Sequence, residues 1–212
     1  MSAAPAGKRE RRKHQTRAAL VAQAQRLFRE RGFERTRIED VASAAGIAVG
    51  TCYNYFERKP DLLIAVVLDS DRTAIAEAEP IFDSLPDDPA AALTAIGLHD
   101  SRHSMAALDK PGWRHLLAAT LEHPDTAFAR SYAETTLELR GLMIRGLTQL
   151  HARGSLPADL DTLGVARTVF AAKYMLFIDH VSDDAAPFSQ HEAEVRQAID
   201  IVVNGLLGPR PS

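Results

Sequence analysis

Apolar residues recur three or four positions apart along nearly the whole chain, the spacing of one face of an α-helix. Leu20, Ala24, Leu27 and Phe28 set this pattern in the first periodic segment. Clusters of glycine and proline interrupt it, and no segment alternates apolar and polar residues as a strand does. The pattern therefore predicts an all-α protein. The expected helices cover about 16–31, 60–79, 90–108, 112–122, 124–153, 162–182 and 190–207, with two shorter helices between 36 and 55.

Charge is distributed unevenly along the chain. Residues 1–59 hold 13 Lys/Arg and 6 Asp/Glu, a balance of +7, whereas residues 60–212 hold 12 and 22, a balance of −10. Such asymmetry indicates a basic segment that faces nucleic acid or a membrane, carried on an acidic body. The alternative is a chance polarisation of solvated surfaces.

Cysteine usage and hydropathy narrow the class of protein. The single cysteine, Cys52, excludes an internal disulfide framework and a Cys-based zinc site, and it fits a reducing compartment. No apolar run is long enough to cross a bilayer, and the polar N-terminus lacks the apolar segment of a secretory signal. We therefore expect a cytoplasmic protein without a membrane partner.

The stretch AAGIAVGTCYNYF, residues 44–56, joins two short helical segments through a glycine. Thr36 and Glu39 have the spacing of a capping box for the first of them. Gly46 ends that helix and permits a tight, left-handed turn. Gly50 inside the next short helix costs about 1 kcal/mol relative to alanine, which makes sense where a side chain would hold the helix off its target. The arrangement predicts a helix-turn-helix whose second helix enters the major groove of DNA.

Residues 16–63 also resemble the DNA-binding domain of the TetR family of bacterial transcriptional repressors. The matching residues are Leu27, Phe28, Gly32, Phe33, Thr36, Ile38, Val41, Ala42, Ala45, Gly46, Ile47, Gly50, Thr51, Tyr53, Tyr55, Phe56, Lys59, Leu62 and Leu63. The resemblance implies a helix-turn-helix domain at 15–59. The residues before it lack an apolar face, so they predict a disordered basic arm at 1–14 that is either solvated or phosphate-seeking. The resemblance also implies a helical ligand-binding and dimerisation domain at 60–212.

The resemblance assigns roles within the helix-turn-helix. Residues that would contact DNA phosphates are Arg37, Thr51, Tyr53, Tyr55 and Lys59, and residues that would face base edges are Val49, Gly50 and Asn54. The chain departs from the family pattern at three places. Ala48 replaces a capping serine, Val49 replaces a residue that is often polar, and Cys52 replaces a larger aliphatic residue, where it would act as a small buried hydrophobe.

The two last long helices resemble those that pair in TetR-family dimers, so they predict a homodimer interface. Its expected members are Leu163, Phe170, Tyr174, Phe177, Val195, Ile199, Val202 and Leu206, which also fit a plain core. The middle helices would enclose the cavity of a small-molecule effector. Its expected lining is His99, His103, Trp113, His115, His123 and Tyr132.

His99 and His103 stand four residues apart, a spacing that two ligands of one metal ion can adopt. Because no motif supplies a third ligand, we expect packing or surface histidines and neither a metal nor a cofactor. The predicted function is a homodimeric, ligand-responsive repressor that a small molecule releases from a palindromic operator in double-stranded DNA.

Three alternatives remain open at this point. One is an enzyme that uses the His-rich middle helices and carries a regulatory helix-turn-helix, although no nucleophile elbow, phosphate loop or metal motif is present. Another is a non-specific DNA-packaging protein, against which the acidic body argues. The third is an activator in place of a repressor.

Overall fold

In the computed structural model, which describes residues 7–207, the described chain folds into ten α-helices and contains no strand. The helices are α1 (Lys8–Arg31), α2 (Ile38–Ala44), α3 (Val49–Tyr53), α4 (Lys59–Ala76), α5 (Glu79–Asp83), α6 (Pro89–Ala107), α7 (Lys110–Glu122), α8 (Ala127–Ala152), α9 (Thr162–Ser182) and α10 (Phe188–Leu207). The predicted all-α class is confirmed.

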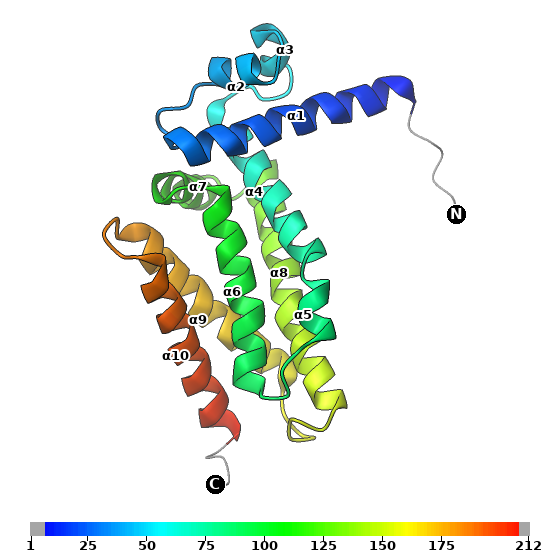
Figure 1. The fold of residues 1–212 in the computed structure, drawn as a ribbon, viewed down its shortest axis with the longest axis vertical. Coiled ribbons are helices and arrows are strands. Elements are labelled where there is room, and N and C mark those ends of the chain that lie inside the picture. The colour runs from blue at the N-terminus through cyan, green and yellow to red at the C-terminus, as the bar shows by residue number, and fades with distance from the viewer. Residues whose placement is uncertain (1–6, 208–212) are drawn as a thin grey trace.

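Helix α1 lies across one end of the molecule, with α2 and α3 on its outer side (Figure 1). Helix α4 leads from this end into a bundle that it forms with α6, α8, α9 and α10. Helix α7 lies between α1 and the bundle and contacts α4, α8 and α9. The N-terminal unit therefore meets the body through α4, α6 and α7.

Two apolar cores hold the chain together. The first joins buried residues of α1 to α3 with the first half of α4 and with residues of α6, α7 and α9, among them Ala107, Trp113 and Phe177. The second lies inside the body and includes Leu93, Met143 and Ile199. Because α4 contributes to both cores, it couples the packing of the two units.

The N-terminus differs from the prediction. Residues 1–6 of the predicted arm lie outside the described residues, but residues 8–14 are the first two turns of α1. Their side chains are exposed, so no apolar face announces the helix. Arginine, lysine and glutamate are nevertheless good helix formers, and extending an existing helix needs no new nucleus.

Two further local predictions need correction. Thr36 does not cap α2, because it is buried and its hydroxyl donates to the backbone oxygen atoms of Leu27 and Gly32. The Arg37 amide instead donates to the Asp40 carboxylate at 2.9 Å, so the N-terminus of α2 starts one residue later. The predicted break after residue 79 contains the short helix α5, which accepts Pro80 in its first turn because the first helical amides need no partner.

Candidate DNA interface and core cavity

The turn between α2 and α3 is built as the sequence predicts. Gly46 adopts φ +66°, in the left-handed region that favours glycine, and the Ile47 amide donates to the Ala42 oxygen at 2.9 Å. Cys52 is fully buried beneath α3 and belongs to the apolar core of the N-terminal unit. Burial of this one face fixes which residues α3 presents outwards.

The outward face of α3 holds all three residues predicted to read bases. Val49 and Gly50 on α3 and Asn54 just after it are exposed. A methyl group added at Gly50 would meet no protein atom within 4 Å, so packing inside the chain does not require glycine there. The missing side chain leaves the surface of α3 flat, which suits close approach to another molecule.

Three of the residues predicted to contact phosphates surround this face and differ in how free they are. Thr51 is exposed, and Tyr55 is half-buried against the core. The Tyr53 hydroxyl donates to the Glu39 carboxylate at 2.8 Å, which ties α3 to α2. This hydrogen bond, after the backbone hydrogen bond of Glu39 itself, lowers the pKa of that carboxyl.

Lys59 and Arg37 complete the predicted phosphate set. The Lys59 ammonium donates to the backbone oxygen of Glu34 at 3.1 Å and lies 4.0 Å from the centre of the Phe33 ring. Burial against these groups lowers its pKa. An ammonium has three donors, so further partners remain possible. Arg37 is exposed at the start of α2.

The helical extension of α1 adds basic residues for which the sequence left a solvated or a phosphate-seeking role open. They line a hollow of about 620 Å³ together with polar groups around α3. Its lining is Arg9, Arg12, Lys13, Thr16, Gly46, Ile47, Thr51, Asn54 and Tyr55. The hollow thus joins the basic start of α1 to the face of α3 in one concave, positively charged surface.

A small cavity lies in the body between α4, α6, α7, α8 and α9. Trp113 and Tyr132, two of the six residues predicted to line an effector pocket, face it. The Trp113 indole N–H donates to the Ser104 oxygen at 2.9 Å, and the Tyr132 and Tyr174 hydroxyl oxygens are 3.4 Å apart. The enclosed space is about 20 Å³, roughly the room of one water molecule.

The four predicted histidines do not line this cavity. His99 contacts the Ala74 oxygen at 2.7 Å, and His103 lies beside it and 3.5 Å from the Glu77 carboxylate on the α4 side of α6. His115 lies 3.4 Å from Glu34 near the N-terminal unit, and His123 is exposed at the end of α7. Sequence spacing alone did not reveal which helix face meets which neighbour.

Ionisable residues line the cavity in their place. The Lys173 ammonium of α9 pairs with the Asp100 carboxylate of α6 in the bundle interior. Asp71 of α4 is 3% exposed, and burial together with the Asp100 charge raises its pKa to about 7 despite the attraction of Lys173. Asp71 follows Leu63 and Val67 at helical spacing, and this position on an apolar stripe was the signal for its burial.

The predicted dimer residues divide into two groups. Phe170, Phe177, Val195 and Ile199 are buried in the chain's own core, so they cannot present a face to a second copy. Leu163 and Leu206 are about half exposed, and Tyr174 and Val202 are intermediate. Two large apolar residues that were not predicted, Met175 and Ile201, are more exposed than these, at 55% and 65%.

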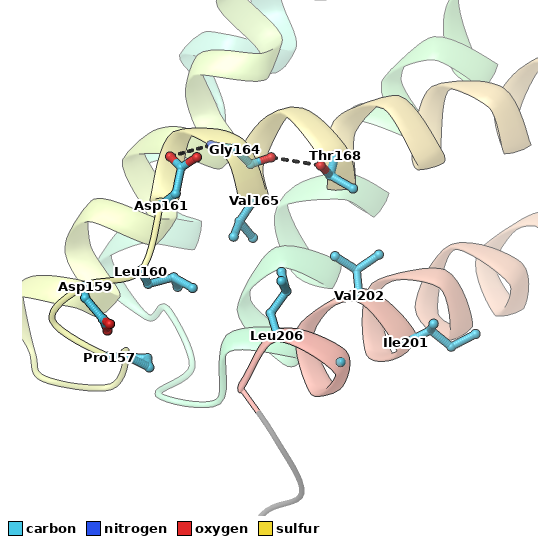
Figure 2. Close-up of a pocket in the computed structure, with 11 residues that line it drawn as sticks. Pro157, Asp159, Leu160, Asp161, Gly164, Val165, Thr168, Ile201, Val202 and Leu206 are labelled. Carbon is cyan, nitrogen blue, oxygen red and sulfur yellow. Dashed lines mark hydrogen bonds between the residues drawn. The ribbon is translucent and has the colours of Figure 1, made fainter.

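A groove of about 640 Å³ accompanies the exposed residues of α10. It lies between the start of α9 and the last turns of α10, where Leu206, Val202 and Ile201 line one side (Figure 2). On the other side the Asp161 carboxylate accepts from the Gly164 amide at 2.9 Å and caps α9. The apolar end of α10 is therefore open to solvent in the single chain.

Within residues 7–207, no group of three or more His, Cys, Asp or Glu side chains is placed to hold a metal ion. In the same part of the chain, no helix has the length and apolar character needed to cross a membrane.

The chain is similar to known bacterial transcriptional regulators. Residues 20–66 match the family model of bacterial regulatory proteins, tetR family. The HTH-type transcriptional regulator UidR of Escherichia coli is 21% identical over 193 residues, which cover 91% of this chain and 93% of UidR. TtgR of Pseudomonas putida, also an HTH-type transcriptional regulator, is 26% identical over 161 residues, 74% of this chain and 76% of TtgR.

Solved structures agree in fold. Thermus thermophilus FadR, a TetR-family transcriptional repressor in complex with lauroyl-CoA, superposes with a TM-score of 0.66 at 22% identity and covers 92% of this chain and 99% of its own. Bacillus subtilis FadR in complex with stearoyl-CoA gives 0.64 at 19% identity, with 89% and 98% covered. The likeness spans both the helix-turn-helix and the helical body.

Proposed function

Because the chain belongs to the TetR family of bacterial regulatory proteins, we propose that it is a homodimeric transcriptional repressor that a small molecule releases from a palindromic operator. The observation that carries this proposal is the exposed face of α3 beside the basic start of α1. Val49, Gly50 and Asn54 would lie in the major groove, where Asn54 could pair with adenine and Val49 could contact a thymine methyl.

Contacts to phosphate would come from two sides of α3. Thr51 and Tyr55 share their hollow with the basic residues of α1, and Lys59 and Arg37 lie beyond it. Tyr53 would exchange its bond to Glu39 for a phosphate oxygen, or keep it and hold α3 in register. Such contacts position the protein, whereas base contacts specify the sequence.

A dimer is proposed because one short recognition helix contacts few bases, and two on an inverted repeat double the contacts. Leu163, Met175, Ile201 and Leu206 supply exposed apolar surface on α9 and α10 for the second copy. Two-fold symmetry of such a pair matches the symmetry of a palindrome.

Effector binding in the body would reach the DNA-binding unit by two routes. One is α4, which shares both cores. The other is the start of α7, where the Asp109 carboxylate accepts from the Phe33 amide at 3.2 Å and Lys110 donates to the Asp183 and Ala186 oxygens at 2.6 Å. Helix α7 thus contacts both the N-terminal unit and the turn between α9 and α10.

Release of DNA requires a dimer with one conformation that binds the operator and another that does not. To shift the ratio of the released to the DNA-binding conformation from 1:99 to 99:1, an effector must bind the released conformation more tightly by about 5.5 kcal/mol.

The test is selection of binding sites from random duplex DNA by the purified full chain at about physiological salt. We expect enrichment of an inverted repeat. Asn54→Ala should relax the preference at one position in each half-site, while Lys59→Ala should weaken binding to all sequences alike. Recovery of no repeat, with only salt-sensitive background binding, would contradict the proposal. A uniform loss in the Asn54 variant would contradict its role in reading bases.

A further inference from the structure

We propose that the core cavity is built for an effector with a positively charged nitrogen on an apolar or aromatic body, and that the Asp71 carboxylate is its counter-ion. This inference rests on the proposed function, since it names the class of molecule that the effector site takes. It is carried by the cavity and by the polar groups placed inside it.

Asp71 is a buried carboxyl group that faces the cavity. It is 3% exposed and lines the cavity, yet no group in the described part of the chain donates a hydrogen bond to its carboxyl. A buried polar group without a partner costs free energy, and an unpaired charge costs more. A ligand that supplies a charged donor would remove that cost.

The charges around Asp71 select the sign of the ligand. Lys173, the one buried cation that faces the cavity within residues 7–207, is already held by Asp100. With Asp71 ionised, the three side chains carry a balance of −1. An incoming carboxylate or phosphate would meet two acidic groups and a lysine that is already paired, whereas an ammonium would restore neutrality.

Aromatic rings complete a cation site. Trp113 and Phe177 meet edge to face at 5.0 Å, and Phe170 and Tyr174 lie parallel at 6.4 Å on the same lining. Tyr132 faces the cavity from α8. Ring faces attract cations most strongly where water is excluded, and the same rings would pack on the apolar body of the ligand.

The cavity has to open before a ligand of this kind can enter, because its enclosed space is only about 20 Å³. The rings that would move stand on α7, α8 and α9, and the counter-ion stands on α4. Occupation would therefore displace α4 and α7, two of the helices that pack against the DNA-binding unit. The site differs from what the acyl-CoA of the two FadR structures would need, since acyl-CoA is anionic.

The experiment uses Trp113, the sole tryptophan of the chain, as the reporter inside the cavity. The probes are 4-phenylbutylamine, 4-phenylbutanol and 4-phenylbutanoate, which share one apolar body and differ in charge. Titration of the full chain near pH 8, followed by tryptophan emission, should show the amine binding tightest and the acid weakest.

The decisive variant is Asp71→Asn, which should weaken amine binding roughly tenfold or more and leave alcohol binding within about threefold. Asp69→Asn is the matched control, because Asp69 is an exposed carboxylate on the same helix. It should behave as the unaltered chain does. Folding of both variants is checked by the thermal transition.

Three outcomes would overturn the proposal: equal binding of the three probes, tighter binding of the acid, or an amine affinity that Asp71→Asn leaves unchanged. A chain that selects an operator but binds none of the probes would also overturn it and leave the proposed repressor intact. A chain that binds the amine through Asp71 but selects no operator would instead contradict the proposed function alone.

Discussion

The DNA-binding unit and the body place their polar groups in opposite ways. From residue 7 to residue 68, the buried polar side chain is Thr36, and its hydroxyl is fully engaged with backbone oxygen atoms. The body buries a set of ionisable residues, namely Asp71, Asp100, Lys173, His180 and His191. The DNA-binding unit exposes its ionisable side chains around an apolar core, whereas the body buries several of its own.

The contrast has an energetic meaning. A helix-turn-helix must hold α3 rigid against its target, and an apolar core does this without buried charges. A buried ion pair such as Asp100 with Lys173 adds little stability over apolar packing, and the nearby Asp71 carboxyl adds a further desolvation cost. For His180 and His191, burial lowers the pKa, that of His191 to about 4, which favours the neutral imidazole.

The largest expected effect comes from removing the buried cation of the body. Lys173→Met leaves Asp100 buried without its partner and should lower the free energy of unfolding by about 3–5 kcal/mol, as measured by chemical denaturation. The double variant Asp100→Asn with Lys173→Met removes both charges and should recover most of the loss. If Lys173→Met were as stable as the unaltered chain, the body would tolerate Asp100 without its partner. The difference in buried charge between the two units would then have no energetic consequence.

The next effect is a pH dependence confined to the body. Asp71 faces Asp100 of α6 and Lys173 of α9, with the Tyr132 hydroxyl of α8 on the same cavity. Its folded pKa of about 7 lies above the reference value of 3.8, so the folded state holds the proton more firmly. The stability that this group contributes is present below about pH 4 and is lost as the pH rises to about 7, by at most about 4 kcal/mol.

Denaturation of the unaltered chain and of Asp71→Asn between pH 4 and 8 measures this contribution. The difference between the two curves should change with pH in favour of the asparagine variant as the pH rises. Parallel curves would show that Asp71 has an ordinary carboxyl pKa. Asp69→Asn again serves as the control, since an exposed carboxylate should leave the curve unchanged.

The two units also differ in how far the sequence predicts them. The helix-turn-helix depends on local relations: Gly46 makes the turn, Cys52 anchors α3, and the exposed positions follow from helical spacing. The cavity depends on which faces of five helices meet. A helical wheel cannot supply that information, so the sequence predicts His99 and His103 as pocket residues and gives no role to Asp71, which lines the cavity.

Charged side chains are hard to place from the sequence for a related reason. The basic start of α1 has no apolar face, so periodicity gives no sign of the helix. Lys173 lies between Phe170 and Phe177 at helical spacing, which marks it as buried, but a lysine is ordinarily taken as solvated. Burial of Phe170 and Phe177 in the chain's own core likewise shows that helical spacing cannot separate a core face from an interface.

Two glycines, one in each unit, test whether the exposed surface of α3 binds DNA. Gly50 of α3 and Gly141 of α8 both face open space, so a leucine at either site should leave stability equal or raise it by up to about 1 kcal/mol. Gly50→Leu should weaken binding to the selected operator by about ten- to a hundredfold, because it projects a side chain from the face that approaches DNA, whereas Gly141→Leu should not. Fluorescence anisotropy with a labelled operator measures both. Equal affinities would remove α3 from the interface.

The smallest expected effect concerns a single charge on the extension of α1. Arg12 lines the hollow beside Thr51 and Asn54, and a phosphate bound there would release about 0.9 counterion for each copy of the chain. Arg12→Gln should therefore make the plot of log affinity against log salt shallower by about 0.9 per copy, with the selected sequence unchanged. Arg196→Gln removes an exposed charge on α10, far from α3, and controls for net charge. An equal change in both variants would mean that overall charge, and not the hollow, attracts the DNA, and an unaltered slope for Arg12→Gln would leave the extension of α1 outside the interface.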